Sequence, residues 1–242
     1  MKKKLPPQVK TKGLNMTTLN MTTITYAVTI TGKMPLLMHR DNIEWSDQME
    51  AWRNNASNKK GSKAGDDRSP AFRWLGCLYH DDEHVWIPSE NIARCLMEGG
   101  AMVPVPGGKN GKTFKSQTQS GMMCAEPGWR LQVGGKYISH DSLFSLESQP
   151  NFAEHIAEAK KQGFTLFVKR AKIGTQKHVR VRPRFDDWSA SGSIVVMDEQ
   201  ITIEVLAEVL EYAGRYKGLG DWRPGGKTPG PYGTFTATVK PI

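Results

Sequence analysis

The densest run of basic side chains lies between residues 164 and 185, where arginine alternates with valine. If Val179 and Val181 face a core, Arg180, Arg182 and Arg184 share the opposite face. Their spacing along a strand would be ~7 Å, close to that of phosphates in a single strand of nucleic acid. No acidic residue falls in this segment, which favours a phosphate track over a solvated strand face. The residues predicted to bind a nucleic-acid backbone here are Lys169, Arg170, Lys172, Lys177, His178, Arg180, Arg182 and Arg184.

A glycine-rich stretch from Lys217 to Gly233 carries a second set of candidates. Six of its seventeen residues are glycine, so its backbone could approach a ligand closely and present N–H groups to phosphate. Trp222 and Tyr232 offer faces on which bases could stack. The pattern fits neither a Walker A loop nor a dinucleotide fingerprint, and the alternative is an ordinary connection between a helix and an edge strand. The predicted binding residues are Lys217, Gly218, Gly220, Trp222, Arg223 and Lys227.

Three carboxylates, Asp41, Glu44 and Asp47, follow the first predicted strand. Carboxylates at such spacing could hold a metal or serve acid–base chemistry, but the charged start of a helix explains them more simply. The sequence context shows no Ser-His-Asp or Cys-His set. The pattern alone therefore assigns no catalytic residue, and neither a metal nor a cofactor is expected.

Composition narrows the class of partner. The 242 residues carry a formal charge of +9, with 33 basic and 24 acidic side chains. Such a chain favours polyanionic partners, which are nucleic acid, an anionic membrane or an acidic protein, and a generically basic protein is the alternative. No apolar run approaches the ~20 residues that cross a bilayer, so no membrane association is expected.

The cysteines and the N-terminal residues indicate a cytoplasmic location. Cys77, Cys95 and Cys124 show no framework spacing, which favours a reducing compartment and disfavours a structural zinc site. The charged start of the chain is followed by no apolar region, so it is not expected to be a signal peptide. Residues 1–21 are interpreted as a flexible basic arm, or as a plain disordered tail.

The elements that must position these residues follow from hydrophobic period and end signals. Alternating apolar residues predict a strand over 22–31, and further strands are expected over 164–173, 179–184, 193–201 and 234–239. Ser89 and Thr202 could cap two amphipathic helices that end at Gly99-Gly100 and Gly214. The order predicts an α+β fold with a ferredoxin-like (RRM-type) βαββαβ core. Residues 22–242 would form a single domain, with insertions near 53–73 and 100–150.

Three segments, in this order along the chain, resemble the RAMP superfamily of CRISPR-associated proteins, and most of all the backbone subunit that polymerises along CRISPR RNA. Residues 32–38, Gly-Lys-Met-Pro-Leu-Leu-Met, look like its first strand and turn. Residues 86–96, beginning Trp-Ile-Pro-Ser-Glu, look like its helix entry, although the family's glycine is missing. Residues 218–223 and 230–235, Gly-Leu-Gly-Asp-Trp-Arg and Gly-Pro-Tyr-Gly-Thr-Phe, look like its glycine-rich loop and last strand.

The resemblance implies contacts to the sugar-phosphate backbone, head-to-tail filaments and a mobile thumb hairpin that wedges between bases. Residues 53–73 or 100–121 are the thumb candidates, the latter with Lys109, Lys112 and Lys115. The resemblance also allows an acidic residue of the first loop, here Asp41, to cleave RNA. Solitary phage-borne relatives share the glycine-rich pattern, which implies a location in the bacterial host cytoplasm.

The function expected first is sequence-independent binding of single-stranded RNA or DNA by a cooperative homo-oligomer. A RAMP-type endoribonuclease is one alternative. The other is a mimic or subunit that acts through CRISPR effector or phage replication proteins.

Overall fold

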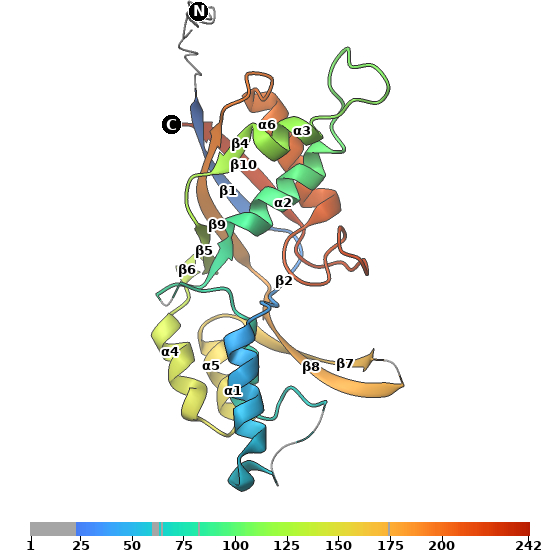
Figure 1. The fold of residues 1–242 in the computed structure, drawn as a ribbon. Coiled ribbons are helices and arrows are strands. Elements are labelled where there is room, and N and C mark those ends of the chain that lie inside the picture. Colours follow the sequence, from blue (N-terminus) through green and yellow to red (C-terminus); the bar gives the residue numbers. More distant parts are fainter. Residues whose placement is uncertain (1–22, 60–62, 64, 82, 174) are drawn as a thin grey trace, which may run out of the picture.

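The computed structural model describes residues 23–59, 63, 65–81, 83–173 and 175–242 (Figure 1). The arm expected at residues 1–21 lies outside the described residues. The fold is mixed α+β with antiparallel sheets, which confirms the expected class. The strands are β1 (Ile24–Gly32), β2 (Leu36–Leu37), β3 (Trp86–Pro88), β4 (Met122–Cys124), β5 (Gly128–Val133), β6 (Lys136–Tyr137), β7 (Thr165–Ile173), β8 (Gln176–Phe185), β9 (Trp188–Val196) and β10 (Phe235–Pro241). The α-helices are α1 (Ile43–Asn54), α2 (Ser89–Gly100), α3 (Lys115–Ser120), α4 (His140–Phe144), α5 (Phe152–Lys161) and α6 (Ile203–Tyr212).

The larger sheet has the strand order β10-β1-β9-β5-β3, with β4 also paired to β9 and β6 to β5. All of these pairs are antiparallel. Along β1 the alternation predicted from the sequence puts Tyr26, Val28 and Ile30 on the buried face. Helices α2 and α6 lie across this face (Figure 1). No helix in the described part of the chain has both the length and the apolar character to cross a membrane.

The two helices on this sheet follow the predicted apolar pattern, and α2 ends at Gly100 as predicted, but one cap and one end differ from the prediction. The Thr202 side chain accepts a hydrogen bond from the amide of Val205, so the predicted cap of α6 is confirmed. The predicted cap of α2 is wrong, because Pro88 occupies the cap position and the Ser89 hydroxyl donates to the carbonyl of Glu126. Gly214 does not stop α6 either, since a π-helical turn (Ala213–Lys217) extends it.

The smaller sheet has the order β2-β8-β7, and its β7–β8 hairpin projects from the body (Figure 1). Strand β8 is held at one edge by β2, where Leu36 pairs with Phe185. Farther along that edge the amide of Val179 donates to the carbonyl of Gly65 at 2.7 Å, and the amide of Asp67 donates to the carbonyl of Val179 at 2.9 Å. The hairpin is thus fixed by a segment distant in sequence.

The insertion expected near 53–73 has two parts. The described residues between 54 and 65 lie mostly at the surface, whereas Asp66 and Asp67 are buried and a 3-10 helix (Ala71–Cys77) follows them. Residues 65–67 show no apolar period because they contact β8 through backbone hydrogen bonds and through the carboxylate of Asp67. That kind of contact leaves no hydrophobic pattern in a sequence.

The face of the larger sheet opposite the helices is lined by small hydroxyl side chains. Thr29 of β1 lies opposite Ser191 of β9 and Thr238 of β10, and Thr31 lies opposite Ser189 and Thr236. The hydroxyls of Thr29 and Ser191 are 2.8 Å apart. The row of Thr31 and Ser189 continues through Gln132 of β5 to the exposed Tyr137 of β6, which lies on the same face.

One hydrophobic cluster joins both sheets. Trp129 and Trp188 of the larger sheet belong to it, as do Phe185 of β8, Trp74 and Phe164. Trp188 lies just after β8 and donates to the carbonyl of Met34, which leads into β2. The hairpin is therefore anchored to the body through the shared core at its base.

Candidate functional site

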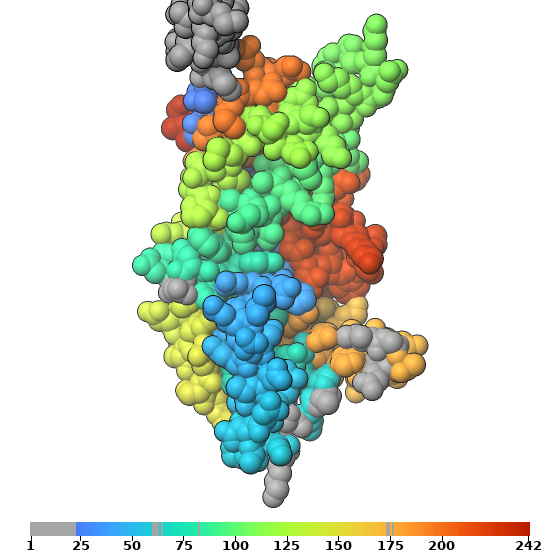
Figure 2. All heavy atoms as spheres, viewed as in Figure 1, coloured from blue at the N-terminus to red at the C-terminus, as the bar shows by residue number. Residues whose placement is uncertain are grey.

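A cleft of about 550 Å³ separates the β7–β8 hairpin from the glycine-rich loop. Figure 2 shows these two parts of the chain next to each other on the surface, with the segment after β2 beside them. The hairpin contributes Phe167, Lys169, Ala171, Arg180 and Arg182 to the lining. The loop contributes Gly220, Asp221, Trp222, Arg223, Gly226, Lys227 and Thr228, and Leu37 and His39 complete the lining. The structure thus brings together the two predicted sets of residues.

Other predicted residues lie outside this cleft. Arg184 forms an ion pair with Asp186 at 2.6 Å. Lys172 and Lys177 pair with each other near the tip of the hairpin, and Arg170 pairs with Val179. Gly218 is buried, with its carbonyl oxygen accepting from Arg223. Lys217 and His178 also do not line the cleft. The alternation of valine and arginine in β8 therefore did not distinguish Arg184, outside the cleft, from Arg180 and Arg182, which line it.

Aromatic side chains connect the two walls of the cleft. The ammonium group of Lys169 lies 3.3 Å from the centre of the Trp222 ring, a cation–π contact. Tyr232 packs between Trp222 and Phe167, with ring centres 5.4 Å and 5.8 Å away. Trp222 adopts φ +51°, a conformation rare for a bulky residue. This turn presents the indole to the cleft. Phe167, which also lines the cleft, was not among the residues predicted from the sequence.

The backbone of the glycine-rich loop is used internally, contrary to the expectation that its N–H groups face a ligand. The amides of Leu219, Asp221 and Gly233 donate to the carbonyls of Gly233, Leu37 and Pro35. The amides of Gly225, Gly226 and Gly230 donate to Lys217 and Arg223. Glycine is needed at 233 because a Cβ there would overlap the Leu219 carbonyl oxygen. A ligand in the cleft would therefore meet mainly side chains.

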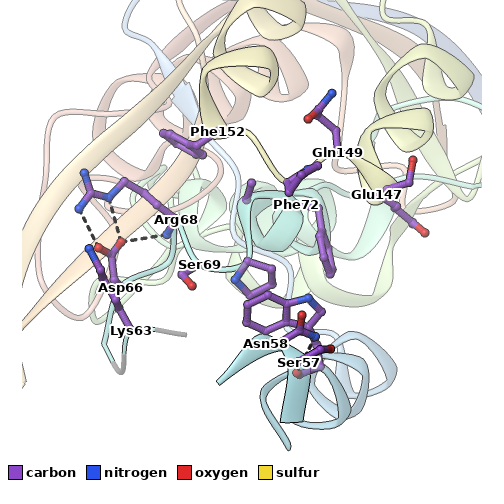
Figure 3. A pocket seen from close by; sticks show the side chains of 15 residues that line it. Ser57, Asn58, Lys63, Asp66, Arg68, Ser69, Phe72, Glu147, Gln149 and Phe152 are labelled. Atoms are coloured by element: carbon purple, nitrogen blue, oxygen red, sulfur yellow. Dashed lines mark hydrogen bonds and ion pairs between the residues drawn. The ribbon is translucent and has the colours of Figure 1, made fainter. Parts of the chain in front are cut away.

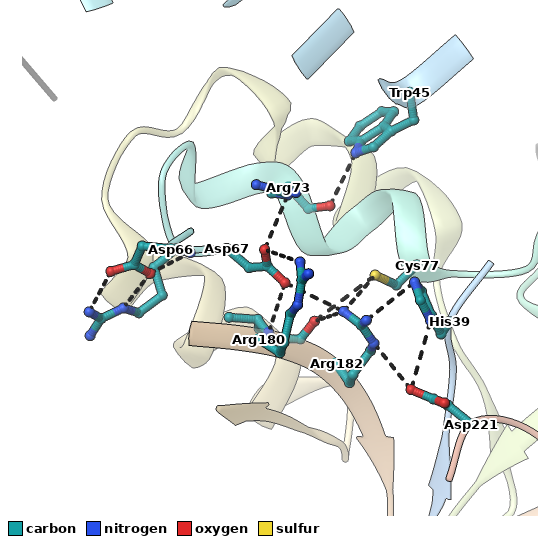
Figure 4. A network of polar contacts seen from close by, with 11 residues as sticks. His39, Trp45, Asp66, Asp67, Arg73, Cys77, Arg180, Arg182 and Asp221 are labelled. Atoms are coloured by element: carbon teal, nitrogen blue, oxygen red, sulfur yellow. Dashed lines mark hydrogen bonds and ion pairs between the residues drawn. The ribbon is translucent and has the colours of Figure 1, made fainter. Parts of the chain in front are cut away.

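The arginines of β8 are neutralised in part by carboxylates from other segments, which corrects the inference drawn from the lack of acids in 164–185. Asp67, whose side chain is 5% exposed, lies 3.2 Å from Arg180, 3.5 Å from Arg182 and 3.4 Å from Arg73 (Figure 4). Arg182 also reaches Asp221 at 3.4 Å. Because one buried carboxylate is shared among several guanidinium groups, the network keeps an excess of positive charge.

His39 joins this network at the end of the cleft. Its Nε2 lies 3.2 Å from Arg182 and its Nδ1 lies 3.8 Å from Asp221. Burial and the adjacent Arg182 lower the pKa of His39, although Asp221 opposes the shift. The imidazole is therefore neutral at neutral pH. No signal in the sequence indicated this contact, because His39 and Asp221 are distant in the chain.

Arg223 has a structural partner in α2. Its guanidinium lies 3.0 Å from the carboxylate of Glu98, which also pairs with Arg94. Burial would raise the pKa of Glu98, but the hydrogen bonds and charges of Arg223 and Arg94 lower it overall. This contact holds the loop on α2, so Arg223 stabilises the cleft wall in addition to contributing charge.

The remaining candidates lie elsewhere. Asp41 is exposed and precedes Asn42, the cap of α1, while Glu44 lies in the first turn of that helix. No group of three metal-binding side chains occurs among the described residues. Lys109 and Lys112 lie on an exposed loop between α2 and α3, and Lys115 begins α3. Figure 1 shows this loop at the far end of the helical layer from the hairpin.

The cysteines are poor nucleophiles. Burial raises the pKa of Cys95 to about 12 and that of Cys124 to about 11. Burial also raises the pKa of Cys77, which lies beside Arg182. None of these thiols is a reactive group at neutral pH.

A further cleft of about 810 Å³ lies between α1 and α5 (Figure 3). Its walls carry Trp52, Phe72 and Phe152, and Arg68 lies at one end in a bidentate contact with Asp66. That pairing satisfies the guanidinium internally. No member of the predicted binding sets lines this cleft.

No family model and no curated protein matches the chain.

Proposed function

We propose that the protein binds single-stranded nucleic acid, RNA or DNA, in the cleft between the β7–β8 hairpin and the glycine-rich loop. The main support for this proposal is that the two walls of the cleft combine cationic and aromatic side chains. The ammonium group of Lys169 stacks on the Trp222 ring, and Lys227 and Arg180 line the same cleft. Such a combination attracts phosphates and offers flat faces to unstacked bases. The bases of a duplex are stacked inside and could not use those faces.

A ferredoxin-like core of the RAMP type is part of this proposal. The order β10-β1-β9-β5, with α2 and α6 as the crossing helices, is the order of a βαββαβ unit. RRM sheets stack bases on aromatic residues of the open face, whereas on β1, β9 and β10 the hydroxyl face here carries Thr29, Ser191 and Thr238, and its exposed aromatic residue, Tyr137, lies on the short strand β6. We therefore assign binding to the cleft and not to the sheet. The projecting β7–β8 hairpin takes the place of the thumb that was sought in 53–73 and 100–121.

Filament formation on the strand is the proposed mode of assembly. Among the described strands, β10 pairs only with β1 and leaves one edge free for a neighbouring copy. Negative-stain imaging with and without an oligonucleotide tests this step. Filaments only in its presence are expected, whereas capture of effector or phage replication proteins without nucleic acid would favour the mimic instead.

The binding proposal is tested by fluorescence anisotropy with single-stranded DNA, single-stranded RNA and duplex. Single strands should bind tighter than duplex. Trp222→Ala should weaken binding by about 1–3 kcal/mol, the range for loss of one base-stacking side chain. Tyr137→Ala, an exposed aromatic residue on β6, is the matched control and should bind normally. Equal affinity for duplex, or an unaffected Trp222→Ala variant, would contradict the proposal.

RNA cleavage is the second candidate, favoured by the position of His39. A neutral imidazole can take the proton of a 2′-hydroxyl whose oxygen attacks the adjacent phosphorus, while the 5′-oxygen of the next nucleotide leaves with a proton from water. Arg182 at 3.2 Å could stabilise the charge that develops on the phosphate. His39→Ala should then abolish cleavage of RNA while binding persists, and a substrate with 2′-deoxyribose at the cut site should stay intact. Asp41→Asn tests the acidic residue separately. RNA that remains whole with the unaltered protein excludes this activity.

A further inference from the structure

A second, smaller cavity of about 150 Å³ adjoins the cleft on the other side of His39, Arg180 and Arg182, which line both. Its walls come from the start and one face of α1, from the 3-10 helix at residues 71–77 and from β8. We call it the arginine pocket. Its lining arginines are Arg40, Arg53, Arg73, Arg180 and Arg182.

The charges of the arginine pocket are not balanced. The carboxylates that line it in the described part of the chain are Asp41 and Asp67. Asp67 is already shared by Arg73, Arg180 and Arg182 (Figure 4). Arg40 and Arg53 form no ion pair with a described carboxylate. An anion that carries more than one negative charge would neutralise the excess of arginine over carboxylate in the pocket.

The basic groups around the pocket show the effect of this imbalance. Burial lowers the pKa of Arg73, and Arg53 and Arg180 add to the shift, while Asp67 opposes it. Arg180 and Arg182 likewise lower the pKa of His39 in addition to the effect of burial. Negative charge placed between these groups would stabilise their protonated forms and raise the pKa of each.

Arginine and cavity size select phosphate among anions. The planar guanidinium group binds phosphate oxygens through paired N–H donors, and several of them around one site suit a tetrahedral anion. A cavity of about 150 Å³ suits one such group. We place any attached nucleotide in the adjoining cleft, which shares His39, Arg180 and Arg182 with the pocket.

We propose that the arginine pocket binds the terminal phosphate monoester of a nucleic-acid strand whose following nucleotides lie in the cleft. A monoester carries more negative charge than the diester of an internal phosphate, which matches the excess of arginine over carboxylate. The choice of a strand end as ligand rests on the proposed function. A free phosphate ion offers the same chemistry and is the other source of the ligand.

The first experiment compares oligonucleotides of one sequence that end in a 5′-phosphate, a 3′-phosphate or hydroxyl groups only. Anisotropy should show one phosphorylated form binding about tenfold or more tighter than the hydroxyl form. The Arg40→Gln/Arg53→Gln variant, which leaves the Asp67 contacts in place, should lose this preference. Its affinity for the hydroxyl form should change less than threefold. Arg130→Gln, on an exposed position of β5, is the control and should keep the preference.

The second experiment titrates inorganic phosphate while the His39 imidazole is followed by NMR. Phosphate should raise the pKa of His39, and the double variant should not show the rise. Binding of hydroxyl-ended strands without any preference for a terminal phosphate would overturn the inference and leave the proposed function standing. If no strand binds but phosphate shifts His39, the ligand is the free ion and the strand end is excluded. If neither experiment responds, both proposals fail.

Discussion

At the scale of residues, Arg180 and Arg182 serve two purposes. Both contact the buried carboxylate of Asp67, so they help to hold β8 against the 65–67 segment. Both also line the cleft, where Arg182 is only 13% exposed and is fixed by His39 and Asp221. A preorganised guanidinium loses little conformational entropy when an anion binds. Lys169 and Lys227 lack such carboxylate partners among the described residues and remain available for phosphate.

His39 makes binding sensitive to pH. The free protein keeps the pKa of His39 below its usual value of ~6.5, and a bound phosphate would raise it. Affinity should therefore increase as pH falls from neutrality through the pKa of the bound state. Below the pKa of the free state the gain levels off, because the imidazole is then charged in both states. The charged and titratable groups that face or neighbour His39 include Arg180, Arg182, Asp221, Asp41, Tyr79, Arg94, Arg223 and Arg40.

Measurements of affinity between pH 5 and 8 test this prediction, since they extend about 1.5 units on either side of the usual value. His39→Gln should remove the pH dependence, since glutamine keeps polarity but does not titrate. His84→Gln, in a turn outside the cleft, is the control and should retain it. A His39→Gln variant with an unchanged pH profile would show that another group is responsible.

At the scale of elements, the hairpin depends on Asp67. Asp67→Asn keeps the size of the side chain but leaves Arg73, Arg180 and Arg182 without their shared buried charge. Loss of one partner of a buried pair costs about 3–5 kcal/mol. Urea unfolding should show a loss of this size. Asp47→Asn, exposed on α1, should change the unfolding free energy by less than ~0.5 kcal/mol.

The glycine-rich loop depends on close backbone packing. Gly233 has φ +70°, and a Cβ there would also overlap the carbonyl oxygen of Leu219. Gly135 has φ +76° with nothing within 4 Å of an added Cβ, so it controls for conformation alone. Gly135→Ala should cost ~1–2 kcal/mol, and Gly233→Ala should cost a further ~1–3 kcal/mol for the overlap. Calorimetric or urea unfolding of the two variants checks this difference, and equal losses would contradict it.

At the scale of the whole molecule, the charge of +9 should make binding depend strongly on salt. Each phosphate contacted on a single strand contributes about −0.7 to the slope of log K against log salt concentration. A strand that contacts about four phosphates would give a slope near −3. Binding isotherms at several salt concentrations measure it. A slope near zero would mean that binding relies on uncharged contacts and not on the basic walls.

The sequence predicted the elements whose signals are local. Alternation identified β1, and the cap at Thr202 with the apolar stripe identified α6. Ion pairs between residues far apart in the chain could not be predicted from the sequence. The same valine–arginine pattern contains Arg180, held by Asp67, and Arg184, held by Asp186. The way the hairpin lies against the glycine-rich loop and against Leu37 and His39 decides which arginines border the cleft, and no periodic signal marks that arrangement.

The hydroxyl face offers a place to attach a label. An introduced cysteine at Thr238 would stand on the sheet surface away from α2 and α6, and no residue of the cleft belongs to that surface. Because burial raises the pKa of each native thiol, a maleimide dye would react selectively with the new one. The molecule could then be tethered to glass by this side while the opposite, basic region stays accessible to diffusing strands.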